Sequence, residues 1–456
     1  MSARLTAWLP ARLRRLVVSE GDDAAAWRTR QLSRSLLTSL ASKGVSSILQ
    51  LVAMPVAIRA LGAELYGVYA VLAGALSWIT MSGVGIGPGL TLRLASGAGG
   101  PDAERRLVTT AALLMSAAAG LALAITAALV ASIGIPGLFG SQLLAYETEL
   151  THGLIAMSIL LAIYLVSTVV DAAQAGYQNQ YLSNLWTIAG NLLTIALLLL
   201  VIPRWSTVVI LIVVIYGSMA LTRVANGISL VVRRPYLIPR WNAISLKVAL
   251  SLLSTGGAFF IGQLAAYVFH QYGAFLVGRI VGPQDAARYA VMSQVIVIAI
   301  GLVTMITTPL WPAIADARAR RDISWILAIY RRTRLTVMGL GTVAGLSIAI
   351  AGEPVIARWI TPDVAPTLAF QALSGCFLAI DAWDNLHYCV LMGLNRPWLC
   401  AGVFALSAVV LIGISAILVP LFGLAGMAAS QCLGRLLVMS WLLPFLISRE
   451  LRLLRT

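Results

Sequence analysis

Long apolar stretches separated by short polar segments fill the chain from about residue 36 onwards. A bilayer core about 30 Å thick is crossed by roughly 20 apolar residues in a helix. Windows of that length predict twelve spans, at 37–59, 66–91, 108–133, 152–175, 183–202, 206–230, 249–278, 287–311, 335–351, 366–393, 398–420 and 423–447. The pattern therefore predicts an all-α polytopic membrane protein.

The same short pattern occurs twice. Residues 59–71 and 279–291 both contain Arg-x-x-Gly followed seven residues later by Tyr-Ala-Val, an offset of 220. Towards the end of each half the offset is 217, because Gly176 matches Gly393. Each half holds an even number of predicted spans, so the repeat is parallel. Duplicated membrane bundles are typical of transporters that rock around a central cavity.

We therefore expect two six-helix lobes around a central cavity. The lobes comprise residues 36–232 and 248–448, joined by a basic cytoplasmic linker at 233–247 and flanked by a basic tail at 1–35 and a short tail at 449–456. The first tail is interpreted either as an amphipathic helix in the headgroup plane or as a disordered basic segment. We expect no removable signal peptide, because no small-residue cleavage site accompanies the first apolar segment.

Composition supports a membrane location. Hydrophobic residues make up 60% of the chain and charged residues 11%, against about a quarter charged in soluble domains. The formal charge of +15 lies in loops between spans, where it indicates topology and not nucleic-acid binding. Most Lys and Arg residues fall on the side of the N-terminus, which places both termini in the cytoplasm. The arginines expected outside are Arg59, Arg204, Arg279, Arg288 and Arg358.

Motifs for catalysis are absent from the sequence. There is no G-x-S-x-G, H-E-x-x-H or P-loop, and the chain has only three histidines. The four cysteines form no C-x-x-C motif, so neither a metal site nor a disulfide is expected. We therefore expect neither an enzyme nor an ATP-driven pump.

Polar residues inside the spans are the main candidates for function. Helix 1 carries Lys43, Ser47 and Gln50 at i, i+4 and i+7, and the equivalent positions of helix 7 carry Gln263, Tyr267 and His270. A lysine facing lipid at a helix centre costs about 2.5–3.5 kcal/mol, which favours two stripes facing a hydrated cavity. The alternatives are that Lys43 snorkels to the headgroups and that the other residues hydrogen-bond between helices.

Charged residues recur in both halves. Asp171 and Arg223 are matched with Asp384 and Arg435, and we expect one ion pair in each half. This assignment leaves Asp381 without a partner. Asp381, Asp384 and His387 follow at i, i+3 and i+6, so they are candidates for a proton or sodium site that couples transport. Alternatively, His387 joins the network of the second ion pair.

Glycine and proline residues end two of the predicted spans. Helix 2 ends with Gly85 and Gly89, and helix 8 ends with Pro309 and Pro312. Such residues allow bending, so both ends are candidate gates, although transmembrane helices are generally rich in Gly and Pro.

Three segments resemble the bacterial lipopolysaccharide and oligosaccharide flippases, whose superfamily includes multidrug extruders and the peptidoglycan lipid flippase. They are MPVAIRALGAELYGVYA at 54–70, Gly85-Ile86 with TLRLA at 91–95, and TPLWPAIADA at 308–317 with Arg321-Asp322. With the spans, the resemblance covers about 36–448. In relatives an acidic residue often precedes the helix 2 glycine, and here that position is Gly83.

The resemblance implies movement of a polyprenyl-pyrophosphate-linked oligosaccharide from the inner to the outer leaflet of the bacterial inner membrane. The glycan would be an O-antigen, capsule or exopolysaccharide unit. Alternating access would move it without a covalent step or cofactor, apart from proton or sodium coupling. The implied partners are membrane lipid and a glycan polymerase or glycosyltransferases, with no nucleic acid.

Cations and hydrogen-bond donors in the cavity would offset the free-energy cost of removing a pyrophosphate from water. We expect Lys43 and protonated His270 to contact the phosphates, and Gln50, Gln263 and Tyr267 the sugars. Arg59 and Arg279 would receive the headgroup on release, or else are interfacial anchors. The alternative function is a cation-coupled multidrug extruder of the same superfamily, which would need acids where these stripes carry Lys and His.

Overall fold

A computed structural model describes residues 24–81, 83, 85–95, 97 and 99–454. All regular structure within these residues is helical. Most of the tail expected at 1–35 lies outside the described residues, and so do residues 455 and 456. Both interpretations of the N-terminal tail therefore stay predictions.

The first half of the chain forms a bundle that we call the N-lobe. Its helices are α2 (Ala24–Leu76), α3 (Trp78–Met81), α4 (Ile86–Ala95), α5 (Pro101–Phe139), α6 (Glu147–Gly176), α7 (Gln180–Val201), α8 (Val208–Ile212) and α9 (Ser218–Arg233). A straight helix of the 53 residues in α2 would be about 80 Å long. Instead the chain reverses at Gly62, whose φ of 83° suits glycine, so α2 holds the first span and the start of the second.

The second half forms the C-lobe. Its helices are α10 (Leu246–His270), α11 (Tyr272–Ile280), α12 (Pro283–Thr307), α13 (Leu310–Ala319), α14 (Ile323–Trp359), α15 (Leu368–Gly393), α16 (Pro397–Leu436) and α17 (Met439–Leu453). Gly282 has a φ of 136° and repeats the turn at Gly62, while Gly423 with φ 56° reverses α16. At the start of α14, hydrogen bonds from Ser324 and from the Trp325 backbone amide lower the pKa of Asp322.

Within the described residues, eight helical segments are long and apolar enough to cross a membrane. Two of them, Leu37–Thr80 and Pro397–Leu453, contain the reversals at Gly62 and Gly423, so each makes two passes. Together with α10–α11 and α15, these segments account for the twelve passes expected from the sequence. The chain is therefore a multi-pass membrane protein with the expected helical fold.

Packing confirms the internal repeat. Gly176 at the end of α6 lies against Thr91 and Leu94 of α4, and Gly393 at the end of α15 lies against Trp311 and Ile314 of α13. The partners differ in number by 220 and the glycines by 217, as in the sequence. The two halves therefore share the same helix packing at these positions.

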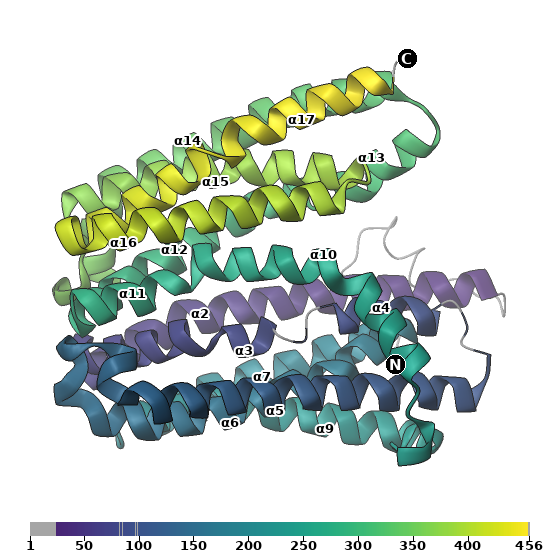
Figure 1. Cartoon of the computed structure of the whole chain (residues 1–456), viewed down its shortest axis with the longest axis horizontal. Helices are drawn as coiled ribbons and strands as arrows, with labels where there is room; N and C mark the ends of the chain where they lie inside the picture. The colour runs from purple at the N-terminus through teal and green to yellow at the C-terminus, as the bar shows by residue number, and fades with distance from the viewer. Residues whose placement is uncertain (1–23, 82, 84, 96, 98, 455–456) are drawn as a thin grey trace, which may run out of the picture.

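The lobes meet at one end of the molecule and diverge towards the other (Figure 1). At the meeting end, Arg59 of α2 donates to the carbonyl oxygens of Trp359 and Ile360, at 3.0 and 3.2 Å. Arg279, the repeat equivalent of Arg59, packs with its backbone and side chain against Gly140. The topology predicted from the sequence puts this end on the outer side.

The linker between the lobes is attached to the N-lobe. Glu104 of α5 accepts hydrogen bonds from the hydroxyls of Tyr177 and Tyr236, both at 2.7 Å. The guanidinium of Arg234 lies 3.6 Å from the centre of the Tyr177 ring. Burial, together with the bond to Glu104, raises the pKa of Tyr177. This polar cluster holds the start of the linker against α5 and α6.

Candidate functional site

Each lobe contains a polar cavity. The one in the N-lobe, which we call the N-cavity, measures about 510 Å³ and lies between α2, α7 and the π-helical segment Val213–Gly217, with Gln271 and Gln294 contributed by the C-lobe. Its polar side chains are Ser46, Gln50, Tyr66, Tyr69, Thr187, Asn191, Thr194, Tyr216, Gln271 and Gln294. None of the described residues that line it is an acid, a lysine, an arginine or a histidine.

Hydrogen bonds order the wall of the N-cavity. Asn191 of α7 donates to Ser46 of α2 at 2.7 Å, and Gln294 donates to Gln50 across the lobe boundary at 3.0 Å. Tyr216 belongs to the π-helical segment, a rare irregularity that is frequent at functional sites. The N-cavity is thus a neutral surface of amides, hydroxyls and aromatic rings.

The second cavity, which we call the C-cavity, measures about 390 Å³. Its polar lining comes from α10, α12, α15 and α16, and comprises Gln263, His270, Thr304, Asp381, Asn385, Tyr388 and Arg435. Unlike the described lining of the N-cavity, its wall contains a carboxylate, a histidine and an arginine.

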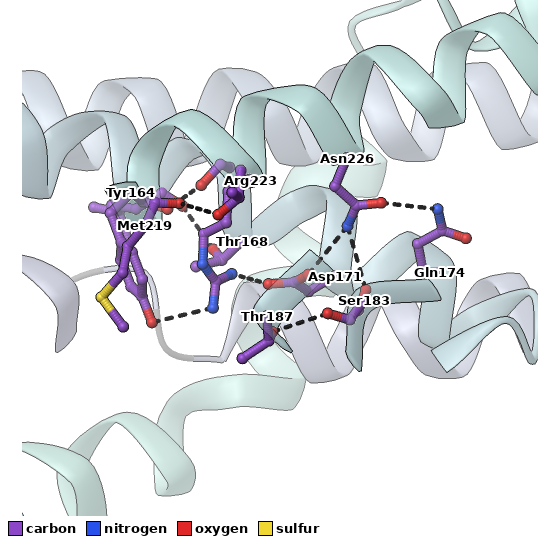
Figure 2. Close-up of polar contacts among 12 residues, drawn as sticks. Tyr164, Thr168, Asp171, Gln174, Ser183, Thr187, Met219, Arg223 and Asn226 are labelled. Carbon is purple, nitrogen blue, oxygen red and sulfur yellow. Dashed lines mark hydrogen bonds and ion pairs between the residues drawn. The ribbon is translucent and has the colours of Figure 1, made fainter. Parts of the chain in front are cut away.

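The expected ion pair of the N-lobe is present. Arg223 of α9 pairs with Asp171 of α6, and its guanidinium also lies 4.3 Å from the centre of the Tyr164 ring (Figure 2). Asn226 donates to Asp171 at 3.5 Å and accepts from Gln174 at 3.3 Å. None of these residues lines the N-cavity. The network therefore joins α6 and α9 beside that cavity.

The ion cluster of the C-lobe differs from the sequence expectation. The expectation that Asp381 has no partner is wrong, because its carboxylate lies 2.7 Å from Arg435. Asp384, the expected partner, is farther from Arg435, at 3.5 Å. Arg435 is only 3% exposed and its guanidinium carbon lies 4.4 Å from the centre of the Phe269 ring. Two carboxylates thus share one cation.

The repeat register explains this difference. The packing of Gly176 and Gly393 sets an offset of 217 between α6 and α15. By that offset Asp171 corresponds to Tyr388, and Asp381 corresponds to Tyr164. The match of Asp171 with Asp384 was therefore wrong, because it ignored this register. Tyrosine and aspartate have exchanged places along the equivalent helices.

The sequence was compared with models of protein families. Residues 32–318 match the model of a family described as "Polysaccharide biosynthesis protein", which is more than half of the sequence. The chain belongs to this family. A comparison with curated proteins gives no match.

Solved structures show the same fold at low sequence identity. An inward-facing multidrug resistance MATE transporter of the MOP superfamily has a TM-score of 0.74 at 14% identity, covering 89% of this chain and 96% of its own. An outward-facing MATE transporter scores 0.59 at 15% identity, with 97% and 98% coverage. A MOP superfamily transporter from Pyrococcus furiosus, described as having a binding pocket of reverse polarity, scores 0.64 at 14% identity, with 97% and 98% coverage.

The stripe of helix 1 lies partly in the N-cavity. Gln50 lines it, whereas the Ser47 hydroxyl donates to the Lys43 carbonyl within α2 at 3.0 Å. Ser46, which sequence reasoning missed, takes the place of Ser47. Lys43 is exposed, three residues before Ser46 and seven before Gln50. It therefore extends the lining face by one turn towards the end where the lobes diverge.

The stripe of helix 7 divides between two locations. Gln263 and His270 line the C-cavity. Tyr267 instead turns to the N-lobe, where its hydroxyl donates to the Gly74 carbonyl at 2.6 Å. Tyr267 thus joins the lobes and does not line either polar cavity.

The three candidates for ion coupling do not lie in one site. Asp381 lines the C-cavity, but Asp384 and His387 do not. His387 is fully buried, with Nδ1 2.6 Å from the Trp383 carbonyl and its ring against Tyr330 of α14. Six residues turn a helix by about 600°, so positions 381 and 387 cannot share a face. Asn385 and Tyr388 are the residues that share the face of Asp381.

Helix breaks occur where gates were expected. Gly85, with φ 112°, lies between α3 and α4, and Pro309 lies between α12 and α13. Gly89 packs against Leu252 of α10, where an added Cβ would lie 3.3 Å from the Leu252 carbonyl oxygen. Pro312 falls in the first turn of α13, where the ring is tolerated. Their role as gates stays a prediction.

Proposed function

We propose that this protein translocates a polyprenyl-pyrophosphate-linked oligosaccharide from the inner to the outer leaflet of a bacterial inner membrane. The two lobes alternate between inward-open and outward-open arrangements, both termini are cytoplasmic, and no covalent step occurs. Membership of the polysaccharide biosynthesis family supports a glycan as cargo. The fold shared with MATE transporters supports alternating access.

One observation carries the choice of cargo. Asp381 is the only carboxylate among the described residues that line the two cavities, and it is paired with Arg435 at 2.7 Å. A transporter of organic cations needs an available acid, because a desolvated cation requires a counter-charge. The cavities offer amides, hydroxyls and aromatic rings, which suit a glycan.

Lys43 is the proposed contact for the pyrophosphate. It lies on the lining face of α2, near the end where the lobes diverge, and no described residue forms a salt bridge with it. We propose His270 as a second contact when it is protonated. Arg59 is bound to backbone carbonyls in this arrangement, so it would be released to the headgroup only when the lobes separate at that end.

Coupling to a proton or sodium ion is proposed at the C-lobe cluster. Asp381, Asp384 and Arg435 together carry one net negative charge if all are ionised. A buried excess charge is costly unless a proton or cation balances it. Asp381 faces the C-cavity and is the entry point for such an ion.

The test compares Lys43→Ala and Lys43→Glu with Arg204→Ala and Arg204→Glu. Arg204 is an exposed cation in a loop, and among the described residues its guanidinium donates to the Leu200 carbonyl alone. Proteoliposomes containing a fluorescent polyprenyl-pyrophosphate oligosaccharide measure leaflet transfer. A charge-assisted hydrogen bond of about 1.5–3 kcal/mol predicts a loss of roughly tenfold or more for Lys43→Ala.

We expect Lys43→Glu to be still less active, and the Arg204 variants to retain activity. Normal transfer by both Lys43 variants would remove Lys43 from the mechanism. If the unaltered protein transfers no lipid-linked glycan but exports a cationic dye, the alternative extruder function replaces the proposal.

A further inference from the structure

We propose that the N-cavity is a binding site for an uncharged sugar unit of the glycan, formed by Asn191, Tyr216 and the Gln50–Gln294 pair. The proposal rests on the proposed function and assigns one part of the cargo to one lobe. The pyrophosphate would lie outside this cavity, towards Lys43.

The wall of the N-cavity offers both hydrogen-bond donors and acceptors. Four amide side chains, Gln50, Asn191, Gln271 and Gln294, line the N-cavity. An amide both donates and accepts, as does each sugar hydroxyl, whereas a phosphate only accepts at neutral pH. Because the described lining has no charged side chain, it offers nothing to neutralise an ion. The wall therefore favours a neutral polyol.

The wall of the N-cavity also has an aromatic surface. Tyr66, Tyr69 and Tyr216 line the same cavity. The Tyr66 and Tyr69 ring centres are 5.5 Å apart. Rings with a polar end can pack against the C–H face of a sugar while their hydroxyls bond its edge. A charged headgroup would gain less from such a surface.

The backbone beside the cavity is irregular at Tyr216. Tyr216 lies in the π-helical segment Val213–Gly217, between α8 and α9. A π-turn interrupts the regular i→i+4 bonding, and it persists when the surrounding structure stabilises it. Tyr216 is the aromatic residue that α8, this segment and α9 contribute to the described lining of the N-cavity. The irregularity thus coincides with the proposed sugar surface.

The site also connects the two lobes. Gln50 belongs to α2 of the N-lobe and Gln294 to α12 of the C-lobe, and their amides are bonded at 3.0 Å. A sugar hydroxyl that inserts between these amides would replace one bond by two. A sugar bound in the N-cavity would therefore form hydrogen bonds with both lobes. The cavity volume of about 510 Å³ lies within the usual range for small-ligand sites.

The experiment separates the two parts of the cargo. Calorimetry on the purified full-length protein measures binding of two probes, inorganic pyrophosphate and the lipid-free oligosaccharide released by mild acid from the organism's own lipid-linked glycan. Leaflet transfer of the intact lipid is measured in parallel. We expect Asn191→Ala to weaken oligosaccharide binding about tenfold, by loss of a buried hydrogen bond, and to leave pyrophosphate binding unchanged.

Asn184→Ala is the matched control. Asn184 lies two turns before Asn191 on α7 and donates to the Thr38 hydroxyl of α2 at 3.1 Å, so it makes the same kind of α7–α2 bond outside the N-cavity. We expect this variant to bind both probes normally. Equal losses in the two variants would show that the effect is structural and would overturn the proposal.

Tyr216 provides a second test that retains the cavity shape. Tyr216→Phe keeps the ring and should bind the oligosaccharide within about threefold of normal, whereas Tyr216→Leu should bind it about tenfold more weakly. Oligosaccharide binding that is equal in Phe and Leu variants would overturn the role of the ring. If the unaltered protein transfers the lipid but does not bind the free oligosaccharide, the N-cavity proposal fails alone. If it transfers no lipid, the proposed function fails.

Discussion

The two lobes place their ion pairs differently relative to their cavities. In the N-lobe, Arg223 and Asp171 pair beside a cavity whose described lining is uncharged. In the C-lobe, Arg435 and Asp381 pair in the cavity wall. The two halves of the repeat therefore carry different polar groups in their cavity walls.

A single exchange along one helix accounts for most of the difference. The tyrosine and aspartate of α6 occupy positions 164 and 171, and their equivalents in α15 are Asp381 and Tyr388. Seven residues of helix span about 10 Å, so the acids of the two lobes lie about two turns apart along the equivalent helices. In each lobe an arginine pairs with the acid.

The largest expected effect separates the two arginines. Arg435→Met should lower the free energy of unfolding by about 3–5 kcal/mol, because it leaves two buried carboxylates without a cation. Arg223→Met should cost less, about 1–3 kcal/mol, because it leaves one part-buried carboxylate and Asn226 still donates to Asp171. Thermal unfolding of purified protein in detergent measures both. Similar losses for the two variants would contradict the contrast between the lobes.

An intermediate effect should separate the two acids of the C-lobe. Asp381→Asn removes the 2.7 Å partner of Arg435 and should cost about 2 kcal/mol. Asp384→Asn leaves one acid with one base and should cost less than about 1 kcal/mol. The same unfolding measurement, with Asp171→Asn as the N-lobe comparison, checks the order. A larger loss for Asp384→Asn would mean that the longer 3.5 Å contact dominates the cluster.

The smallest effect concerns Arg59 and its repeat equivalent Arg279. Arg59→Ala removes two bonds to the backbone carbonyls at the end of α14 and should shift the lobe equilibrium by about 0.5–1 kcal/mol. Arg279→Ala should have little effect, because its contact with Gly140 is by packing and includes its own backbone.

Spin labels at Leu144 and Leu368, both exposed, would report the lobe separation in a background without the native cysteines. We expect a larger population of long distances for Arg59→Ala only. Equal distance distributions in the two variants would remove Arg59 as a specific contact between lobes.

Much of the architecture could be predicted because spans and breaks are local properties. The apolar windows predicted the twelve passes, and Gly85 and Pro309 marked real interruptions between helices. The parallel repeat followed from a few matching residues, and the packing of Gly176 and Gly393 confirms it. Asp171 and Arg223 could be paired by charge alone, because an ion inside a membrane span requires a partner.

The cavity residues were harder to predict because their side chains are uncharged. Asn191 and Tyr216 belong to no motif, and Tyr69 belongs to the repeated pattern, which carries no sign of a cavity role. Thr187, Asn191 and Thr194 do form a polar stripe on α7. Tyr267 had the right spacing for a cavity, but its hydroxyl bonds the other lobe. His387 was misplaced because six residues do not return to the same helical face. An exact repeat register would have revealed the exchange of tyrosine and aspartate.

Helix α10 has a mechanical consequence. It packs on α4 and α5 of the N-lobe as well as on α16 of the C-lobe, and the amide before it, at Ser245, donates to Thr110 of α5 at 3.2 Å. Any rearrangement that separates the lobes must therefore part α10 from one neighbour or bend it along its length. The helix that follows the linker is therefore packed against both lobes and does not act as a flexible connection.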